Sequence, residues 1–165
     1  MIDTKTLAIG FNAISKKMSE KRMDLISLDQ QTGDGDLGIS MDNGFKAVSD
    51  VCCVNANTSD IGKLLFLAGK SFNEAAPSSL GTIISMLLID AAKQLKGAEK
   101  TTLADFGNIM HKSMNAIMEK LDSRLGEKTF FDSVVPAVKA LCDEAAVSDE
   151  QRLKNAAEAA RNGAE

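Results

Sequence analysis

The sequence predicts an all-α fold in which about seven helices form an antiparallel bundle or closed ring. Apolar residues recur every three or four positions along most of the 165-residue chain. Apolar volume comes from Leu, Ile, Val, Ala and eight Met, and the chain has no Trp or Tyr. No segment alternates strictly between apolar and polar residues, as a half-buried strand does. The short loops between the predicted helices favour antiparallel neighbours.

Two of the predicted helices flank a polar segment near the N-terminus. Residues 4–23 carry an apolar stripe, and Asp3 or Thr4 can cap the start of this helix. Residues 24–43 interrupt the helical spacing, and a short helix is expected at about residues 40–50. We therefore expect most of the chemistry to be concentrated in residues 24–43.

Two further helices are predicted in the middle of the chain. One covers about residues 58–73 and has Thr, Ser and Asp as capping residues at its start. The other covers about residues 77–96 and is stopped by Gly97. Its first half, residues 82–89, is apolar almost all round, which predicts a helix that is buried on most faces.

The last three predicted helices each have a capping residue. A helix over about residues 102–121 begins with a Thr-x-x-Asp capping box. Thr129 caps the next helix, and Pro136 is expected to kink it or to delay its start. Ser148 and Gln151 form the capping box of a final Ala-rich helix.

The composition is that of an acidic, ordinary globular protein. The net charge is −4 with a pI near 5.1, and no basic stripe favours binding to nucleic acid. The three cysteines are expected to be reduced thiols of a cytoplasmic protein, without a disulfide framework or a zinc site. Neither a signal peptide nor a membrane span is predicted, because the apolar runs are too short.

The segment at residues 28–38 has the most specific chemical pattern. It contains Asp29, Asp34 and Asp36, and its glycines allow the backbone to curl so that the carboxylates converge. Converging carboxylates repel one another unless a hard cation lies between them, and Mg²⁺ prefers oxygen ligands and substrate phosphates. The segment therefore predicts a magnesium site suited to the phosphates of a nucleotide.

Two alternatives apply to the same segment. A solvated polar loop without a ligand is one, because Asp and Gly are common in loops. A calcium EF-hand is the other, but a loop that starts at Asp34 would need an oxygen ligand at Gly38, Gly at Ile39 and Glu at Phe45. The spacing excludes the EF-hand and leaves the solvated loop open.

A helix start at residues 75–82 is a second candidate site. The free N–H groups and partial positive charge of a helix N-terminus suit phosphate. Ser78, Ser79 and Thr82 add hydroxyl groups, and Gly81 permits close approach of a ligand. Simple N-capping by serine is the alternative interpretation.

Two other patterns have little support. Gly69, Lys70 and Ser71 resemble the end of a P-loop, but Leu64 occupies the position of its first glycine and no strand precedes it. His111 is the sole histidine and is expected to face solvent, so a Ser/His/Asp or Cys/His catalytic unit is not predicted.

The pattern of residues 28–38 resembles the motif Leu-Asp-x-x-Ile-Gly-Asp-Gly-Asp-His-Gly of the DhaL family, the ADP-binding L subunits of dihydroxyacetone kinase. Ser40-Met41 and Gly44-Phe45 resemble the Asn-Met and Gly-Phe that follow the motif in that family. The resemblance implies a barrel of eight antiparallel helices that holds ADP and two Mg²⁺ ions at one end. The implied metal ligands are Asp29, Asp34 and Asp36.

Two other segments resemble the family in the same order along the chain. Residues 75–82 are similar to Gly-x-Ser-Gly-Pro-Leu-Tyr-Gly-Thr, which contacts the nucleotide phosphates in the family. Residues 126–132 are similar to Gly-Asp-Lys-Thr-Met-x-Asp, which lies beside the nucleotide, although a capped helix start explains them too. The implied nucleotide-binding residues are Ser78, Ser79, Leu80, Gly81, Thr82, Lys128 and Thr129.

Three departures from the family pattern change the expectation. Leu37 replaces the histidine of the first motif, and the second motif lacks its aromatic residue. The sequence also stops before the family's Gly-Arg-Ala-Ser-Tyr-Leu-Gly lid loop and eighth helix, either naturally or as a fragment. We therefore expect one domain over residues 1–165, with seven of the eight helices and a weakened hold on the nucleotide.

The resemblance implies a phosphotransferase subunit of a dihydroxyacetone (glycerone) kinase. Such a chain holds ADP or ATP with Mg²⁺ and passes phosphate to a short ketose on a separate K-type subunit, mainly by positioning and charge neutralisation. No catalytic residue is assigned to this chain. In the bacterial version, bound ADP is rephosphorylated by an M subunit of the phosphotransferase system, whereas ATP exchanges freely in single-chain kinases.

Several questions stay open at this point. The acceptor sugar, the phosphate donor and the oligomeric state, including a homodimer, are undetermined. A non-catalytic, nucleotide-responsive regulator on the same domain is the main alternative function, since Leu37 has lost the motif histidine. A helical interaction module that binds neither metal nor nucleotide is a third possibility.

Overall fold

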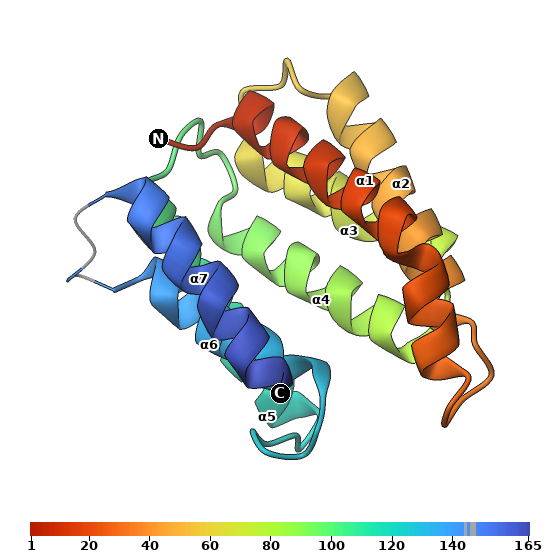
Figure 1. The fold of residues 1–165 in the computed structure, drawn as a ribbon. Coiled ribbons are helices and arrows are strands. Elements are labelled where there is room, and N and C mark those ends of the chain that lie inside the picture. The colour runs from red at the N-terminus through yellow and green to blue at the C-terminus, as the bar shows by residue number, and fades with distance from the viewer. Residues whose placement is uncertain (144, 146–147) are drawn as a thin grey trace. The chain divides into compact units, whose positions relative to one another are not determined.

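The fold is all-α, as the sequence predicts. The computed structural model describes residues 1–143, 145 and 148–165, and these form seven helices without a strand (Figure 1). The helices are α1 (Thr4–Asp29), α2 (Leu37–Val54), α3 (Ile61–Ala75), α4 (Ser79–Gln94), α5 (Leu103–Lys120), α6 (Phe130–Leu141) and α7 (Asp149–Ala164).

The helices α1 to α4 lie in a first compact unit, residues 2–100. In this unit α1 packs on α2, α2 on α3 and α3 on α4, and successive helices run in opposite directions (Figure 1). Because each loop reverses the chain, the loop between α1 and α2 and the start of α4 lie at the same end of the unit. Two of the three predicted binding segments therefore share one end of a single helical unit.

The core of the first unit is centred on α3. Phe72 of α3 makes an edge-to-face contact with Phe45 of α2, with 5.0 Å between ring centroids. The same Phe72 ring lies against Gly44, where a Cβ would be only 2.6 Å from it. In residues 82–89 of α4 only Thr82 is exposed, as the apolar run predicts. The fully inaccessible apolar residues of α2 and α3 are Val48, Cys52, Ile61, Leu64, Leu65, Ala68 and Phe72.

The helices α5 to α7 lie in a second compact unit, residues 101–165, in which α6 packs on both α5 and α7. Pro136 cannot donate a hydrogen bond to the Asp132 carbonyl, one turn earlier. Helix α7 packs closely against this carbonyl, because a Cβ at Gly163 of α7 would collide with the Asp132 carbonyl oxygen. The helix α6 begins directly after its cap Thr129, as predicted, so Pro136 does not delay its start.

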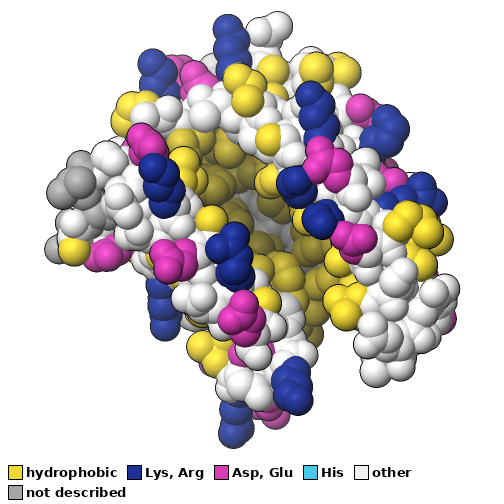
Figure 2. Space-filling view, in the orientation of Figure 1, with side chains coloured by type: hydrophobic (Ala, Val, Ile, Leu, Met, Phe, Trp, Pro, Cys, Tyr) yellow, Lys and Arg dark blue, Asp and Glu magenta, His cyan; other side chains and the backbone are white. Residues whose placement is uncertain are grey.

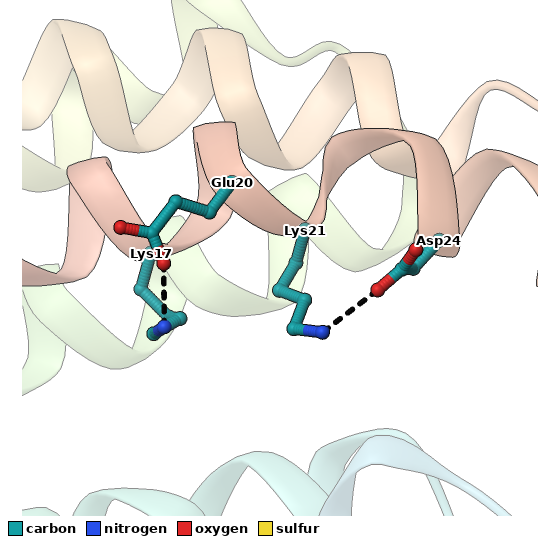
Figure 3. A network of polar contacts seen from close by, with 4 residues as sticks. All are labelled: Lys17, Glu20, Lys21 and Asp24. Carbon is teal, nitrogen blue, oxygen red and sulfur yellow. Dashed lines mark hydrogen bonds and ion pairs between the residues drawn. The ribbon is translucent and has the colours of Figure 1, made fainter.

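The first helix is longer than its apolar pattern predicts, since it continues through residues 24–29, which we expected to be irregular. Ile26 explains part of the extension, because it packs against Gly38 of α2. Exposed ion pairs also line this helix: Lys17 lies 2.5 Å from Glu20, and Lys21 lies 2.8 Å from Asp24 (Figure 3). Pairs with this spacing add a few tenths of a kcal/mol each, roughly.

The second helix is also longer than predicted. It begins at Leu37, not near residue 40, and ends at Val54, not near residue 50. The contact of Gly38 with α1 explains the early start, because packing on α1 stabilises this turn as helix. The acidic segment is consequently a short loop between two long helices.

The surface carries charges of both signs. Figure 2 shows Lys and Arg side chains interspersed with Asp and Glu side chains over the face in view. Among the described residues, no helix has the length and apolar character needed to span a bilayer.

Candidate functional site

The three aspartates of the acidic segment converge in the structure. Asp29 is the last residue of α1, Asp34 lies in the loop, and Asp36 is the N-cap of α2. One carboxylate oxygen from each residue lies within 4.8 Å of the others. Asp29 is half-buried, whereas Asp34 and Asp36 are exposed. We refer to these three residues as the acidic cluster.

Backbone hydrogen bonds hold the acidic cluster in place. The Leu37 N–H donates to Asp29 Oδ2 at 3.2 Å, and the Asp36 N–H donates to Asp34 Oδ1 at 3.3 Å. Asp29 thus satisfies a free amide at the start of α2, where Asp36 makes no side-chain capping bond. The carboxylate at the end of one helix is therefore tied to the start of the next.

Two glycines are required by the shape of this loop. A Cβ at Gly33 would lie 2.6 Å from Asp29 Oδ1, so a side chain there would displace the carboxylate. Gly35 has a φ of +83°, a conformation that L residues with side chains rarely adopt. Both glycines allow the chain to turn tightly enough for the carboxylates to meet.

The acidic cluster has an unfavourable electrostatic environment. The charge of Asp34 raises the pKa of Asp36 above its usual value, and some loss of hydration and the charge of Asp29 raise it further. In the part of the chain that the structure describes, no lysine or arginine forms an ion pair with these carboxylates. The cluster offers only oxygen donors and carries uncompensated negative charge, which fits a hard divalent cation such as Mg²⁺.

The start of α4 presents free amides at the same end of the first unit. Ser78 is its N-cap, and Ser78 Oγ accepts a hydrogen bond from the Gly81 N–H at 3.1 Å. This bond confirms that serine caps the helix. The first amides of the helix, at Ser79 and Leu80, have no acceptor within the helix. Exposed hydroxyl groups of Ser79 and Thr82 lie beside them, so this surface can accept an anion.

Close packing explains the glycine at this helix start. A Cβ at Gly81 would collide with the Ala76 carbonyl, which belongs to the preceding turn. The hydroxyl of Thr82 donates to the Ser78 carbonyl at 2.9 Å, which reinforces the first turn of the helix. Gly81 therefore has a structural role that the sequence analysis did not predict, beside any role in ligand approach.

The third predicted segment lies in the second unit, at the start of α6. Thr129 caps the helix through a hydrogen bond from the Phe131 N–H at 3.2 Å. Lys128 is exposed and has a φ of +58°, a strained conformation for lysine. These two residues line a pocket of about 750 Å³, together with Asp132, Ser133 and Pro136 of α6 and residues 163–165.

Asp132 is a residue of this pocket that sequence reasoning did not assign to a site. Its carboxylate accepts hydrogen bonds from the Gly126 N–H at 2.5 Å and from the Thr129 N–H at 2.8 Å. These bonds lower the pKa of Asp132. The Thr-x-x-Asp spacing was a signal for this arrangement, since it is a capping box with Asp in place of Glu. Asp132 thereby shapes the loop that carries Lys128.

The remaining candidates lie in helices. Lys70 is in the interior of α3 and lies 3.8 Å from Glu74, so the Gly-Lys-Ser sequence is helical and does not form a P-loop. His111 is half-exposed on α5, where its Nε2 lies 3.5 Å from the Asn115 amide.

Comparison with known proteins decides the family. The DAK2 domain matches residues 31–165, which is most of the chain. The chain belongs to the DAK2 domain family. The match includes two of the three aspartates of the acidic cluster, the start of α4 and the pocket at α6.

Several curated proteins resemble this DAK2 chain. The ADP-binding subunit DhaL of the PEP-dependent dihydroxyacetone kinase from Escherichia coli K12 is 29% identical over 117 residues, which cover 71% of this chain and 55% of that protein. The dihydroxyacetone kinase of Komagataella pastoris is 27% identical over 171 residues, which cover 99% of this chain and 27% of that protein. The chain thus spans about half of the length of the first relative and about a quarter of the length of the second.

Solved structures share the DAK2 fold. The dihydroxyacetone kinase from C. freundii in complex with AMP-PNP and Mg²⁺ superposes with a TM-score of 0.78 and is 19% identical. The match covers 94% of this chain and 27% of that kinase. The native form of the same kinase gives a TM-score of 0.76 at 21% identity, covering 96% of this chain and 28% of that one. The helical architecture of the chain is therefore that of the kinase's DAK2 part.

Proposed function

We propose that this chain is the nucleotide-binding part of a dihydroxyacetone kinase and that it holds ADP or ATP with Mg²⁺. The observation that carries the proposal is the convergence of Asp29, Asp34 and Asp36 within 4.8 Å, at the end of a helical unit where α4 also starts. Membership of the DAK2 family and the ADP-binding relatives support the same function.

In this proposal the acidic cluster holds the metal, two ions by the family resemblance, and the start of α4 holds phosphate oxygens. Mg²⁺ supplies charge neutralisation for the phosphates when it is bound. The N–H groups of Ser79 and Leu80 and the hydroxyl of Ser79 then donate hydrogen bonds to phosphate oxygens, and the Thr82 hydroxyl joins them only by leaving the Ser78 carbonyl. Catalysis by this chain consists of positioning and charge stabilisation, which are the main contributions in phosphoryl transfer.

Lys128 and Thr129 are proposed as further nucleotide-binding residues. Their support is the pocket of about 750 Å³ in the second unit, where Lys128 is exposed and forms no ion pair with another of the described residues. An exposed ammonium group of this kind attracts a phosphate as a point charge. Asp132 maintains the loop conformation that presents it.

The acceptor is proposed to be a short ketose on a separate K-type subunit, as the resemblance to the DhaL family implies. The phosphate donor is then either exchanging ATP or, in a bacterial system, a phosphotransferase-system M subunit that rephosphorylates bound ADP. The PEP-dependent relative from Escherichia coli supports the second route.

Calorimetric titration of ADP, with and without Mg²⁺, tests the proposal. We expect magnesium-dependent binding that Asp34→Asn abolishes. Asp50→Asn is the matched control, because Asp50 is an exposed aspartate of α2 that pairs with Lys46 at 3.1 Å and lies outside the acidic cluster. No binding by the folded chain, or equal loss in both variants, would contradict a nucleotide site at the acidic cluster.

A nucleotide-responsive regulator without catalysis is the second candidate. Leu37 favours it, because an apolar side chain stands where the family motif has histidine. Phosphoryl transfer to dihydroxyacetone in the presence of a K-type subunit separates the two functions. Magnesium-dependent ADP binding without any transfer would support the regulator.

A further inference from the structure

We infer that Ser19, Arg22 and Asp42 form a clamp between α1 and α2 that positions the acidic cluster for cation binding. The inference rests on the proposed metal site and adds three residues to it. None of the three belongs to the acidic cluster. They are therefore positioning residues, which act through the geometry of the two helices that carry the aspartates.

The clamp is a polar contact between two helices. The carboxylate of Asp42 in α2 accepts a hydrogen bond from Ser19 Oγ in α1, and Arg22 Nη1 in α1 lies 3.3 Å from its other oxygen. The Asp42 side chain is only 14% exposed, whereas the other paired acidic side chains are 34% exposed or more. Among the ion pairs of the described residues, this is the one that joins two helices.

The clamp lies close to the acidic cluster along both helices. Arg22 precedes Asp29 in α1, and Asp42 follows Asp36 in α2, each by roughly two helical turns. Between the clamp and the cluster, Gly38 packs directly on the Arg22 carbonyl and on Ile26. The contact at Gly38 sets the spacing of the helices, and the clamp opposes sliding or rotation of one helix along the other.

This geometry matters because the acidic cluster is divided between the two helices. Asp29 belongs to α1, whereas Asp36 caps α2, so a shift of one helix along the other changes the distance between their carboxylates. Repulsion among the three carboxylates, whose oxygens lie within 4.8 Å of one another, favours such a shift. The clamp keeps the carboxylates together before a cation arrives, which lowers the cost of assembling the site.

The charges of the clamp residues allow a sharp test. If these residues acted only through their charge, removal of the positive Arg22 would strengthen cation binding. Under the same assumption, removal of the negative Asp42 would weaken cation binding. Ser19 is neutral, so its removal would then have no effect. A positioning clamp predicts that Ser19→Ala, Arg22→Gln and Asp42→Asn all weaken binding, each by about tenfold.

We would measure Mn²⁺ binding to the full chain from the paramagnetic resonance signal of free Mn²⁺. Asp50→Asn controls for the loss of one negative charge from α2, and Arg22→Lys is expected to restore part of the affinity because it keeps a donor for Asp42. Urea unfolding of each variant verifies that it is folded. We expect small changes in stability, because Arg22 is 45% exposed and exposed ion pairs contribute little.

The outcomes separate the clamp from the metal site itself. Loss of affinity in all three variants, with Asp50→Asn close to wild type, supports the clamp. Tighter binding by Arg22→Gln, or unchanged binding by Ser19→Ala, overturns it and leaves the metal site intact. Absence of Mn²⁺ binding by the wild-type chain overturns both the clamp and the metal site of the proposed function.

Discussion

At the scale of single residues, the fold brings the three carboxylates of the acidic cluster within 4.8 Å of one another, so that they repel. Asp36 has a raised pKa because Asp34 and Asp29 lie beside it. A carboxyl group with a raised pKa in the folded state binds more protons there than in the unfolded chain. Its contribution to stability is therefore present in acid and is lost as the pH rises through its folded-state pKa.

Asp36→Asn should stabilise the chain when no divalent cation is bound. In EDTA at neutral pH, the substitution removes one repelling charge and raises the free energy of unfolding. The gain should shrink as the pH falls through the folded-state pKa of Asp36 toward the ordinary value of 3.8, because the wild-type carboxyl is then protonated. Urea unfolding at several pH values measures this. A gain that is independent of pH would contradict the repulsion.

The glycine at the closest point of α1 and α2 should tolerate no side chain. Gly38→Ala places a methyl group against the Arg22 carbonyl and Ile26, so we expect a loss of about 1–3 kcal/mol in the free energy of unfolding. Gly10→Ala is the matched control within α1, because nothing lies within 4 Å of the added methyl group. The control should gain about 0.5–1 kcal/mol from reduced backbone entropy in the unfolded state.

At the scale of elements, hydrogen bonds between near neighbours in sequence determine where most helices begin. The N-caps Asp60, Ser78, Thr102 and Ser148 each accept a bond from the amide three residues later. The start of α2 differs, because its free amide at Leu37 is satisfied by Asp29 from the preceding helix. A search for capping residues in the sequence therefore predicts the starts that have their own N-cap bond, but it misses the start of α2.

Thr129→Ala should weaken the start of α6. The substitution removes the hydroxyl that caps the Phe131 N–H, and we expect a loss of about 1 kcal/mol in the free energy of unfolding. Thr129→Ser keeps the hydroxyl and should stay close to wild type. Chemical denaturation of the two variants provides the measurement. Equal losses in both would show that the methyl group of Thr129 matters more than its capping bond.

At the scale of the whole molecule, the chain divides into two compact units, and each contains a predicted binding segment. The acidic cluster and the start of α4 belong to the first unit, and the pocket with Lys128 and Thr129 belongs to the second. The expectation that residues 1–165 act as one nucleotide-binding domain stays a prediction, which the response of both units to a ligand can test.

ADP with Mg²⁺ should stabilise the chain and protect backbone amides from hydrogen exchange. At a ligand concentration of about 100 times Kd, the expected gain in the free energy of unfolding is about 2.7 kcal/mol, and EDTA should remove it. Protection at residues 30–38 and 78–82 is expected from the acidic cluster and the start of α4. Protection at residues 126–132 would support Lys128 and Thr129, whereas unchanged exchange there would remove them from the proposal.

Sequence patterns alone were enough to predict the all-α class, seven helices and most helix starts. These features depend on interactions within one or two turns, namely apolar periodicity and capping bonds, which can be seen in a short stretch of residues. The convergence of Asp29, Asp34 and Asp36 was also predictable, because Gly33 and Gly35 permit the tight turn that a compact loop between them needs. The resemblance to the DhaL family then supplied the expected ligands.

Other features were decided only by tertiary structure. The extension of α1 through Asp29 and the early start of α2 depend on the contact between Ile26 and Gly38. The clamp of Ser19, Arg22 and Asp42 depends on the register of two helices. Such contacts join residues that are far apart in sequence, and their energies come from burial and packing between helices. No pattern within a single helix records them, so only the folded chain reveals them.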